Sequence, residues 1–201
     1  MAVLENDCYL EQPLFFVQDI FGIVFIGIFA TTSHASKMLL IRKGTPDDLP
    51  QALSLIQELA RFENALDEVV TTVEQMQVDG FGPNPAFKMI VAEFNGELVG
   101  LAVYFLKYST WKGKGIYLDD LIVKESFRKH GIGKMLFNAV AEDSVLLNAK
   151  QLHWQVLDWN ENAINFYKKY NATFDNEWIN CKLSDIQLND IIANNKTNES
   201  I

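Results

Sequence analysis

The sequence predicts one mixed α/β (α+β) domain, in which helices flank a central mixed sheet. Three observations support this. Short apolar segments typical of strands alternate with segments of helical periodicity along residues 38–183. The chain has 201 residues, 49% of them hydrophobic, which is enough for one full core but not for two. Charged residues make up 21%, so the composition is not that of a disordered chain.

Local signals mark where several elements begin and end. Residues 45–48 (Thr-Pro-Asp-Asp) combine a cap, a proline at the first helical position and acids in the first turn, as at a helix start. Asn95-Gly96 is typical of a two-residue hairpin. Asn171 follows the last helical segment of the domain, where a left-handed residue is needed.

These signals and the hydrophobic periodicity give an order of ten elements, β-α-α-β-β-β-α-β-α-β. We expect strands at residues 38–42, 87–94, 98–108, 116–123, 152–157 and 178–183. We expect helices after Thr45, after Thr72, and over 133–147 and 163–170.

The two ends of the chain depart from this pattern. The apolar run within residues 1–37 is short of the roughly 18 to 20 residues that a membrane helix needs. A secretory signal requires basic residues before its apolar run, and none precedes this one. We interpret 1–37 as a non-essential apolar extension; a membrane anchor or a hydrophobic cap on the domain are the alternatives. The folded domain would then span 38–186, with a polar, frayed tail over 187–201.

Charge and cysteine content argue against several classes of function. The net charge of −9 and the pI of about 4.8 disfavour binding to nucleic acid and to anionic lipid. Cys8 and Cys181 lie far apart and the three histidines are scattered, so we expect neither a disulfide framework nor a metal. We therefore expect a cytoplasmic protein with no nucleic-acid or membrane partner.

A glycine-rich loop carries the sharpest chemical signal. Residues 128–134 read Arg-Lys-His-Gly-Ile-Gly-Lys, between an apolar strand and an amphipathic helix. Glycines let backbone N–H groups approach an anion, and a following helix N-terminus adds partial positive charge. The loop is neither a Walker motif nor GxGxxG. By itself it is compatible with a pyrophosphate site or with a basic turn facing solvent.

Several motifs together resemble the GNAT superfamily of N-acetyltransferases. Arg-x-x-Gly-x-Gly, beginning at Arg128, looks like the family's acetyl-CoA pyrophosphate loop, and Asn160-x4-Asn-Phe-Tyr looks like its second signature. The Ser-Thr-Trp-Lys-Gly run at 109–113 and Leu-Asp-Trp-Asn at 157–160 are similar to the diamine (spermidine/spermine) acetyltransferases, closest to the thialysine acetyltransferase branch. The resemblance covers residues 38–183.

This resemblance implies acetyl transfer from acetyl-CoA, without a metal, to a primary amine of a small cationic molecule. The acceptor would be a thialysine-like amino acid, a diamine or a polyamine, attacking directly in a ternary complex. We favour thialysine-like molecules or short diamines over spermine, because Ser109 stands where the diamine pattern carries an aspartate. The resemblance also implies a homodimer. A non-catalytic acetyl-CoA-binding sensor on the same fold is the alternative.

The resemblance also assigns residues to roles. The cofactor would be held by Leu121, Ile122, Val123, Arg128, Lys129, His130, Gly131, Ile132, Gly133, Lys134, Asn160 and Tyr167. The substrate would contact Phe62, Glu63, Trp111, Asp119 and Trp154.

Two residues would take part in the chemistry itself. Tyr167 would donate a proton to the departing thiolate. Asp119, where the family usually carries Glu, would act as base through water or as ammonium ligand, while Asp120 would be structural. Plain structural roles remain open for some of these residues: a helix cap for Asn160, and core packing for Tyr167 and the two tryptophans.

Overall fold

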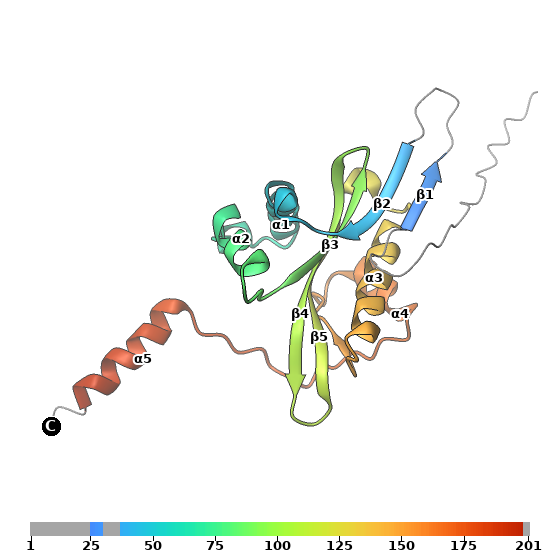
Figure 1. Cartoon of the computed structure of the whole chain (residues 1–201). Helices are drawn as coiled ribbons and strands as arrows, with labels where there is room; N and C mark the ends of the chain where they lie inside the picture. The colour runs from blue at the N-terminus through green and yellow to red at the C-terminus, as the bar shows by residue number, and fades with distance from the viewer. Residues whose placement is uncertain (1–24, 30–36, 199–201) are drawn as a thin grey trace, which may run out of the picture. The chain divides into compact units, whose positions relative to one another are not determined.

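The computed structural model describes residues 25–29 and 37–198, and it confirms the mixed α/β fold with helices flanking a sheet (Figure 1). The described strands are β1 (Phe25–Phe29), β2 (Lys37–Lys43), β3 (Lys88–Phe94), β4 (Glu97–Ser109), β5 (Gly113–Val123) and β6 (Leu152–His153). They form one sheet in the order β1-β2-β3-β4-β5-β6. Neighbours pair antiparallel except β5 and β6, which are parallel.

The chain divides into two compact units, Met1–Gln155 and Val156–Ile201. In the first unit the helices are α1 (Leu49–Phe62), α2 (Val73–Phe81) and α3 (Ile132–Leu146). Short 3-10 helices cover Pro46–Asp48, Leu66–Glu68 and Glu125–Phe127. The second unit contains α4 (Glu161–Lys168) and α5 (Asp185–Asn198).

An ion-pair network fixes the start of α1. Arg42 of β2 donates from both terminal nitrogens to the Asp48 carboxylate, at 2.6 and 2.7 Å, and also binds Glu93 of β3 at 2.8 Å. Asp48 further accepts from the Thr45 backbone N–H at 2.7 Å, which forms the expected cap. Burial raises the pKa of Asp48, but these hydrogen bonds outweigh it and hold the pKa below its usual range. The network ties two strands to one helix.

Two turns have the conformation that the sequence predicts. Asn95 and Gly96 both have positive φ, 53° and 84°, as a type I′ hairpin requires, and they join β3 to β4. Asn171, three residues beyond α4, has φ of 54°, and it is the left-handed residue expected there.

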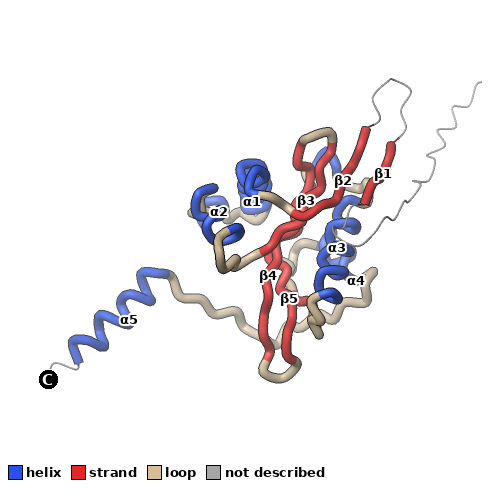
Figure 2. The backbone as a smooth tube through the Cα atoms, in the orientation of Figure 1, coloured by secondary structure: helices blue, strands red, loops and turns tan. Residues whose placement is uncertain are grey.

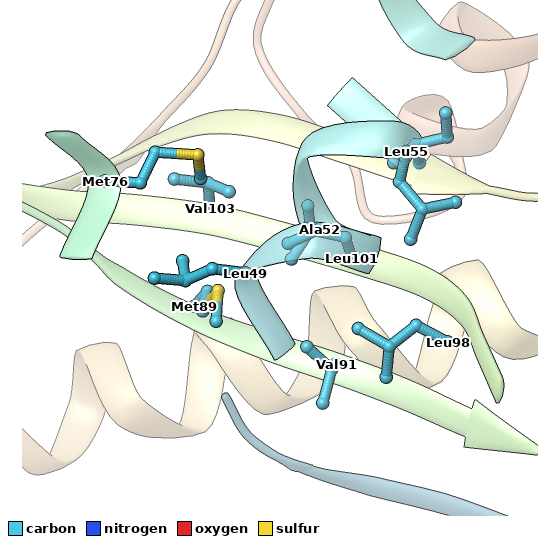
Figure 3. Close-up of a cluster of buried hydrophobic side chains, with 10 residues drawn as sticks. Leu49, Ala52, Leu55, Met76, Met89, Val91, Leu98, Leu101 and Val103 are labelled. Carbon is cyan, nitrogen blue, oxygen red and sulfur yellow. The ribbon is translucent and has the colours of Figure 1, made fainter. Parts of the chain in front are cut away.

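Helices cover both faces of the sheet in the first unit, α1 and α2 one face and α3 the other (Figure 1). The core beneath α1 and α2 consists of ten buried apolar residues drawn from two helices and three strands (Figure 3). They are Leu49, Ala52, Leu55, Met76, Met89, Val91, Leu98, Leu101, Val103 and Ile122.

The α3 face contains a buried charge. Asp143 of α3 is 4% exposed, and it accepts a hydrogen bond of 2.9 Å from the hydroxyl of Tyr104 on β4. Lys88 Nζ lies 3.4 Å from the same carboxylate. Burial and the Asp143 charge raise the pKa of Tyr104 well above its usual value, so the hydroxyl keeps its proton and the bond persists.

Of the predicted strands, the one at 152–157 is shorter than expected and the one at 178–183 does not form. Of residues 152–157, only Leu152 and His153 pair with β5. Residues 178–183 form no strand and are exposed (Figure 2). Their alternation of apolar and polar residues fits a half-buried strand, but strand propensity takes effect only where a neighbouring strand is present to pair with.

The ends of the chain also differ from expectation. The C-terminal segment expected to fray is helical as α5, although its apolar residues do not gather on one face. Within the predicted extension, residues 25–29 form an edge strand and Lys37 begins β2, while residues 1–24 and 30–36 lie outside the described residues. The boundaries at 38 and 186 therefore stay predictions. Among the helices of the described ranges, none is long and apolar enough to cross a bilayer.

We expect Tyr104→Phe to lower the free energy of unfolding by about 1–2 kcal/mol, because Asp143 loses its closest donor while remaining buried. Urea denaturation at neutral pH measures this. Tyr108→Phe is the matched control, since Tyr108 lies on the same strand but is 72% exposed. Equal stability of the two variants would contradict the role of the Tyr104 hydroxyl.

Candidate active site

The edge of β5 opposite β4 is free along most of its length. β6 pairs with β5 only at Ile116 and Tyr117, whereas β4 pairs with every residue of β5 except Asp119. In the described part of the chain, residues 118–123 thus have a strand on one side only. Their backbone N–H and C=O groups on the open side can bind an extended ligand, as an added strand would.

The glycine-rich loop lies at the end of this free edge. Arg128 Nε donates to the backbone oxygen of Val123 at 3.0 Å, which attaches the loop to the strand end. Gly131, with φ of 79°, precedes α3, and a Cβ placed on it would meet no atom within 4 Å. Among the described residues no side chain caps the first turn of α3, so its N–H groups are available to a ligand. The arrangement fits an anion such as a pyrophosphate.

The backbone of this loop is held in a rare conformation. Lys129 has φ of 66°, which costs energy for a residue with a side chain. His130 Nδ1 contacts the backbone oxygen of Phe127 at 3.3 Å, and Gly133 packs close to Val123. These contacts hold Arg128, Lys129 and Lys134, all exposed, around the α3 N-terminus.

A β-bulge in β5 re-aims two carboxylates. Val103 of β4 pairs with Asp120 while the next residue, Tyr104, pairs with Leu118, so Asp119 is the extra residue of β5. Asp120 therefore shares the α1 side of the sheet with the buried Val103. Bulges commonly redirect side chains next to functional sites. This one cannot be detected in the sequence, where the strand reads as a regular run.

Three carboxylates gather at this bulge, and we refer to Glu63, Asp119 and Asp120 as the acid cluster. Glu63 is the C-cap of α1. Burial, then the charges of Asp119 and Glu63, raise the pKa of Asp120 to about 6. Burial also raises the pKa values of Asp119 and Glu63. The charges of Asp119 and Glu63 thus act on Asp120, and this concentration of negative charge marks a site suited to a cation.

The acid cluster lies next to the loop of residues 128–134. The Arg128 guanidinium carbon lies 5.9 Å from the centre of the ring of Phe62, the residue before Glu63. Five features predicted from the sequence are thus brought together in one region: Phe62, Glu63, Asp119, the 121–123 edge and the 128–134 loop. Asp120, for which the sequence suggested a structural role, lies in the same region, and adjacency to Asp119 was its only signal of a function.

The two predicted tryptophans lie elsewhere in the first unit. Trp154 packs edge-on against Phe137 of α3, with ring centres 5.3 Å apart, and this favours a packing role. Trp111 is 86% exposed in the β4–β5 hairpin, where it borders a depression of about 290 Å³.

Asn160 and Tyr167 belong to the second unit. Asn160 Oδ1 accepts from the Ala163 backbone N–H at 3.2 Å, so it caps α4. Tyr167 is buried, its ring centre lies 5.1 Å from that of Phe166, and burial raises its pKa to about 12. These contacts agree with the structural alternatives, and the roles of both residues in cofactor binding and catalysis stay predictions.

The residues described include no group of three or more histidine, cysteine or acidic side chains arranged to hold a metal.

Comparisons with known proteins agree with this geometry. The sequence profile described as acetyltransferase (GNAT) family matches residues 53–172. The chain is 39% identical over 142 residues to thialysine N-epsilon-acetyltransferase of Bos taurus, covering 67% of this chain and 84% of that one. It is 36% identical over 139 residues to spermidine/spermine N(1)-acetyltransferase-like protein 1 of Homo sapiens, covering 66% and 20%.

Solved structures share the fold. An aminoglycoside acetyltransferase from an uncultured soil metagenomic sample, in complex with trehalose, superposes with a TM-score of 0.62. The sequences are 20% identical, and the match covers 73% of this chain and 95% of that one. At this identity the likeness concerns the fold alone.

We expect the stability of the wild-type protein to rise as pH falls through about 6, because the folded state then protonates Asp120 and loses repulsion within the acid cluster. Because the pKa of Asp120 is higher in the folded state, its contribution to stability is fully present below the pKa of the unfolded state, near 4, and is lost as pH rises through about 6. The Asp120→Asn variant has no carboxyl group at this position, so its stability should lack this dependence on pH. Thermal melts of both proteins from pH 4 to 8 measure the difference, and parallel curves would contradict the assignment.

Proposed function

The chain belongs to the acetyltransferase (GNAT) family and is an acyltransferase, and on this premise we propose that it transfers an acetyl group from acetyl-CoA to a primary amine of a small cationic molecule. The observation that carries the proposal is the order of features along β5: an acid cluster at the bulge, a free edge beyond it and an anion-binding loop at the end. A binding module for acetyl-CoA needs the edge and the loop, but it has no need of the acids.

The edge and the loop would hold acetyl-CoA. The backbone of Leu121, Ile122 and Val123 supplies the groups that an amide-containing arm can pair with. The open turn at Gly131 and the uncapped start of α3 supply donors for a pyrophosphate, with Arg128, Lys129 and Lys134 adding full charges. When bound, the co-substrate supplies an activated acetyl group.

The acid cluster would bind and deprotonate the acceptor. An amine arrives as ammonium, and carboxylates hold it by charge-assisted hydrogen bonds. It must lose a proton before it can attack. Asp120 suits this step best, because a carboxylate with a pKa of about 6 accepts a proton near neutral pH more readily than an ordinary one. Asp119, one methylene shorter than the usual glutamate, would then act as ammonium ligand or through a bridging water.

The proposal assigns the second proton transfer to Tyr167, which would protonate the departing thiolate, with Asn160 as a cofactor contact in addition to its capping role. The amine attacks directly in a ternary complex, since the proposed chemistry requires no cysteine nucleophile. A homodimer and a cytoplasmic location belong to the same proposal. They rest on the family resemblance, and light scattering measures the first.

The proposed acceptors are thialysine-like amino acids, diamines and polyamines. The names of the similar proteins from Bos taurus and Homo sapiens support this range, since both refer to amine acetylation. The negative charge of the whole chain, −9, also favours a cationic acceptor.

We expect acetyl-CoA to raise the melting temperature of the wild-type protein, since it would bind only the folded state. Gly131→Asp should abolish the shift, because a carboxylate in the open turn repels an anion. Gly96→Asp is the matched control: Gly96 also has positive φ and open space around it, but it lies in the β3–β4 turn. An equal shift in both variants would sink the proposed cofactor site.

We expect kcat/KM for a diamine to fall below about pH 6, where Asp120 becomes protonated. Asp120→Asn should lower kcat by about 10²-fold or more. Asp119→Asn should move the acidic limb of the profile to lower pH, because it removes a charge that raises the pKa of Asp120. Rate profiles from pH 5 to 9 test both points. An unshifted limb in Asp119→Asn would rule out Asp120 as the titrating group.

A further inference from the structure

One aromatic ring on β5 lies between two groups of opposite charge. Tyr117 stacks on Phe105 of β4, with ring centres 5.2 Å apart and planes at 29°. Burial, then the charge of Asp119, raise its pKa, so the ring lies within the influence of the acid cluster. On its other side, Lys107 Nζ lies 5.4 Å from the centre of the same ring.

The strand register places the positive group and the ring on one face. Tyr117 pairs with Phe105 on one side and with His153 on the other, so these three residues share a face of the sheet. Lys107 is two residues from Phe105 on β4 and therefore lies on that face too. The far end of the β4–β5 hairpin projects beyond α1 and α2, so neither of these two helices covers this part of the face (Figure 1).

Lys107 and His153 both border the depression of about 290 Å³ at this end. His153 Nε2 lies 2.7 Å from Gln151 Oε1, and because an amide oxygen only accepts, Nε2 must donate. A neutral ring then leaves Nδ1 as an acceptor. Burial, then the charges of Lys107 and Lys112, lower the pKa of His153, which keeps the ring neutral near pH 7.

The spacing matches a short molecule with unlike ends. Tyr117 is two residues along β5 from Asp119, about 7 Å of strand, and His153 lies on the neighbouring strand about 5 Å to the side. The separation of Asp119 from His153 is therefore roughly 8–9 Å between backbones. A lysine-length amino acid is shorter than this from its side-chain amine to its α-carbon, and the side chains at the two ends reach across the remainder.

We propose that Lys107 binds the α-carboxylate of the acceptor and His153 Nδ1 accepts from its α-ammonium, so that the acceptor is a free amino acid whose side-chain amine lies in the acid cluster. This inference rests on the proposed function and specifies its substrate. The strip from the acid cluster across Tyr117 to Lys107 is negative at one end and positive at the other. A diamine or polyamine would bring a second ammonium toward Lys107, where like charges repel.

The test compares substrates that differ by one carboxylate. Thialysine and its decarboxylated diamine have the same reacting amine, and kcat/KM is measured for both. The wild-type protein should prefer thialysine. Lys107→Gln should lower kcat/KM for thialysine by about ten-fold or more and leave the value for the diamine unchanged or higher. Lys107→Arg should restore the preference, since it keeps the charge.

Lys114→Gln is the matched control, because Lys114 is exposed on the same hairpin but does not border the depression. It should leave both substrates unaffected. Equal losses on both substrates in Lys107→Gln would show a structural role and overturn the inference, as would no loss on either. A wild-type preference for the diamine would overturn it too, while the acetyltransferase proposal would stand.

Failure of the proposed function gives a different result, in which the wild-type protein acetylates no amine. Calorimetric titration of the same two compounds then decides whether Lys107 binds the α-carboxylate of a ligand. Tighter binding of thialysine than of the diamine, lost in Lys107→Gln and retained in Lys114→Gln, would support it. Equal affinities would refute it.

Discussion

The pairing of β5 is the constraint on which the site depends. On one side β5 is paired with β4 at every residue except Asp119, and this holds the strand in place. On the other side β6 ends after two residues, and no other strand of the described residues pairs with the backbone of 118–123 there. The loop that follows, the bulge at Asp119 and the ring of Tyr117 are all fixed by this one strand. A longer β6 would satisfy more backbone groups, but it would close the edge on which a ligand can pair.

The acid cluster is costly for the fold and useful for chemistry. Carboxylates that stand beside one another in partly buried surroundings oppose ionisation, and the raised pKa of Asp120 reflects that opposition. By contrast, the buried Asp143 on the other face has a hydroxyl donor and a nearby lysine. A protein that satisfies one buried acid and crowds three others at an open edge has placed strain where a cationic ligand would relieve it.

The sequence was sufficient for the parts of the fold that depend on local chemistry. The cap at Thr45, the Asn95-Gly96 turn and the left-handed Asn171 follow from backbone preferences of single residues, and the structure confirms all three. The end of β6 and the missing strand at 178–183 depend on which neighbour is available for pairing, which no local signal reports. The same holds for Asp120, because a bulge is a property of two strands and not of one.

The Arg42 network has a further consequence, for the geometry of recognition. It anchors the first turn of α1, while Glu63 stands at the other end of this 14-residue helix, about 21 Å away. A helix is stiff over that length, so a small tilt at its start becomes a larger sideways displacement at its end. The helix thus acts as a lever. Loss of the Arg42 guanidinium would shift Glu63 relative to the other two carboxylates of the acid cluster and change how well the three fit one ligand. Residues remote from the chemistry can in this way set its accuracy without touching it.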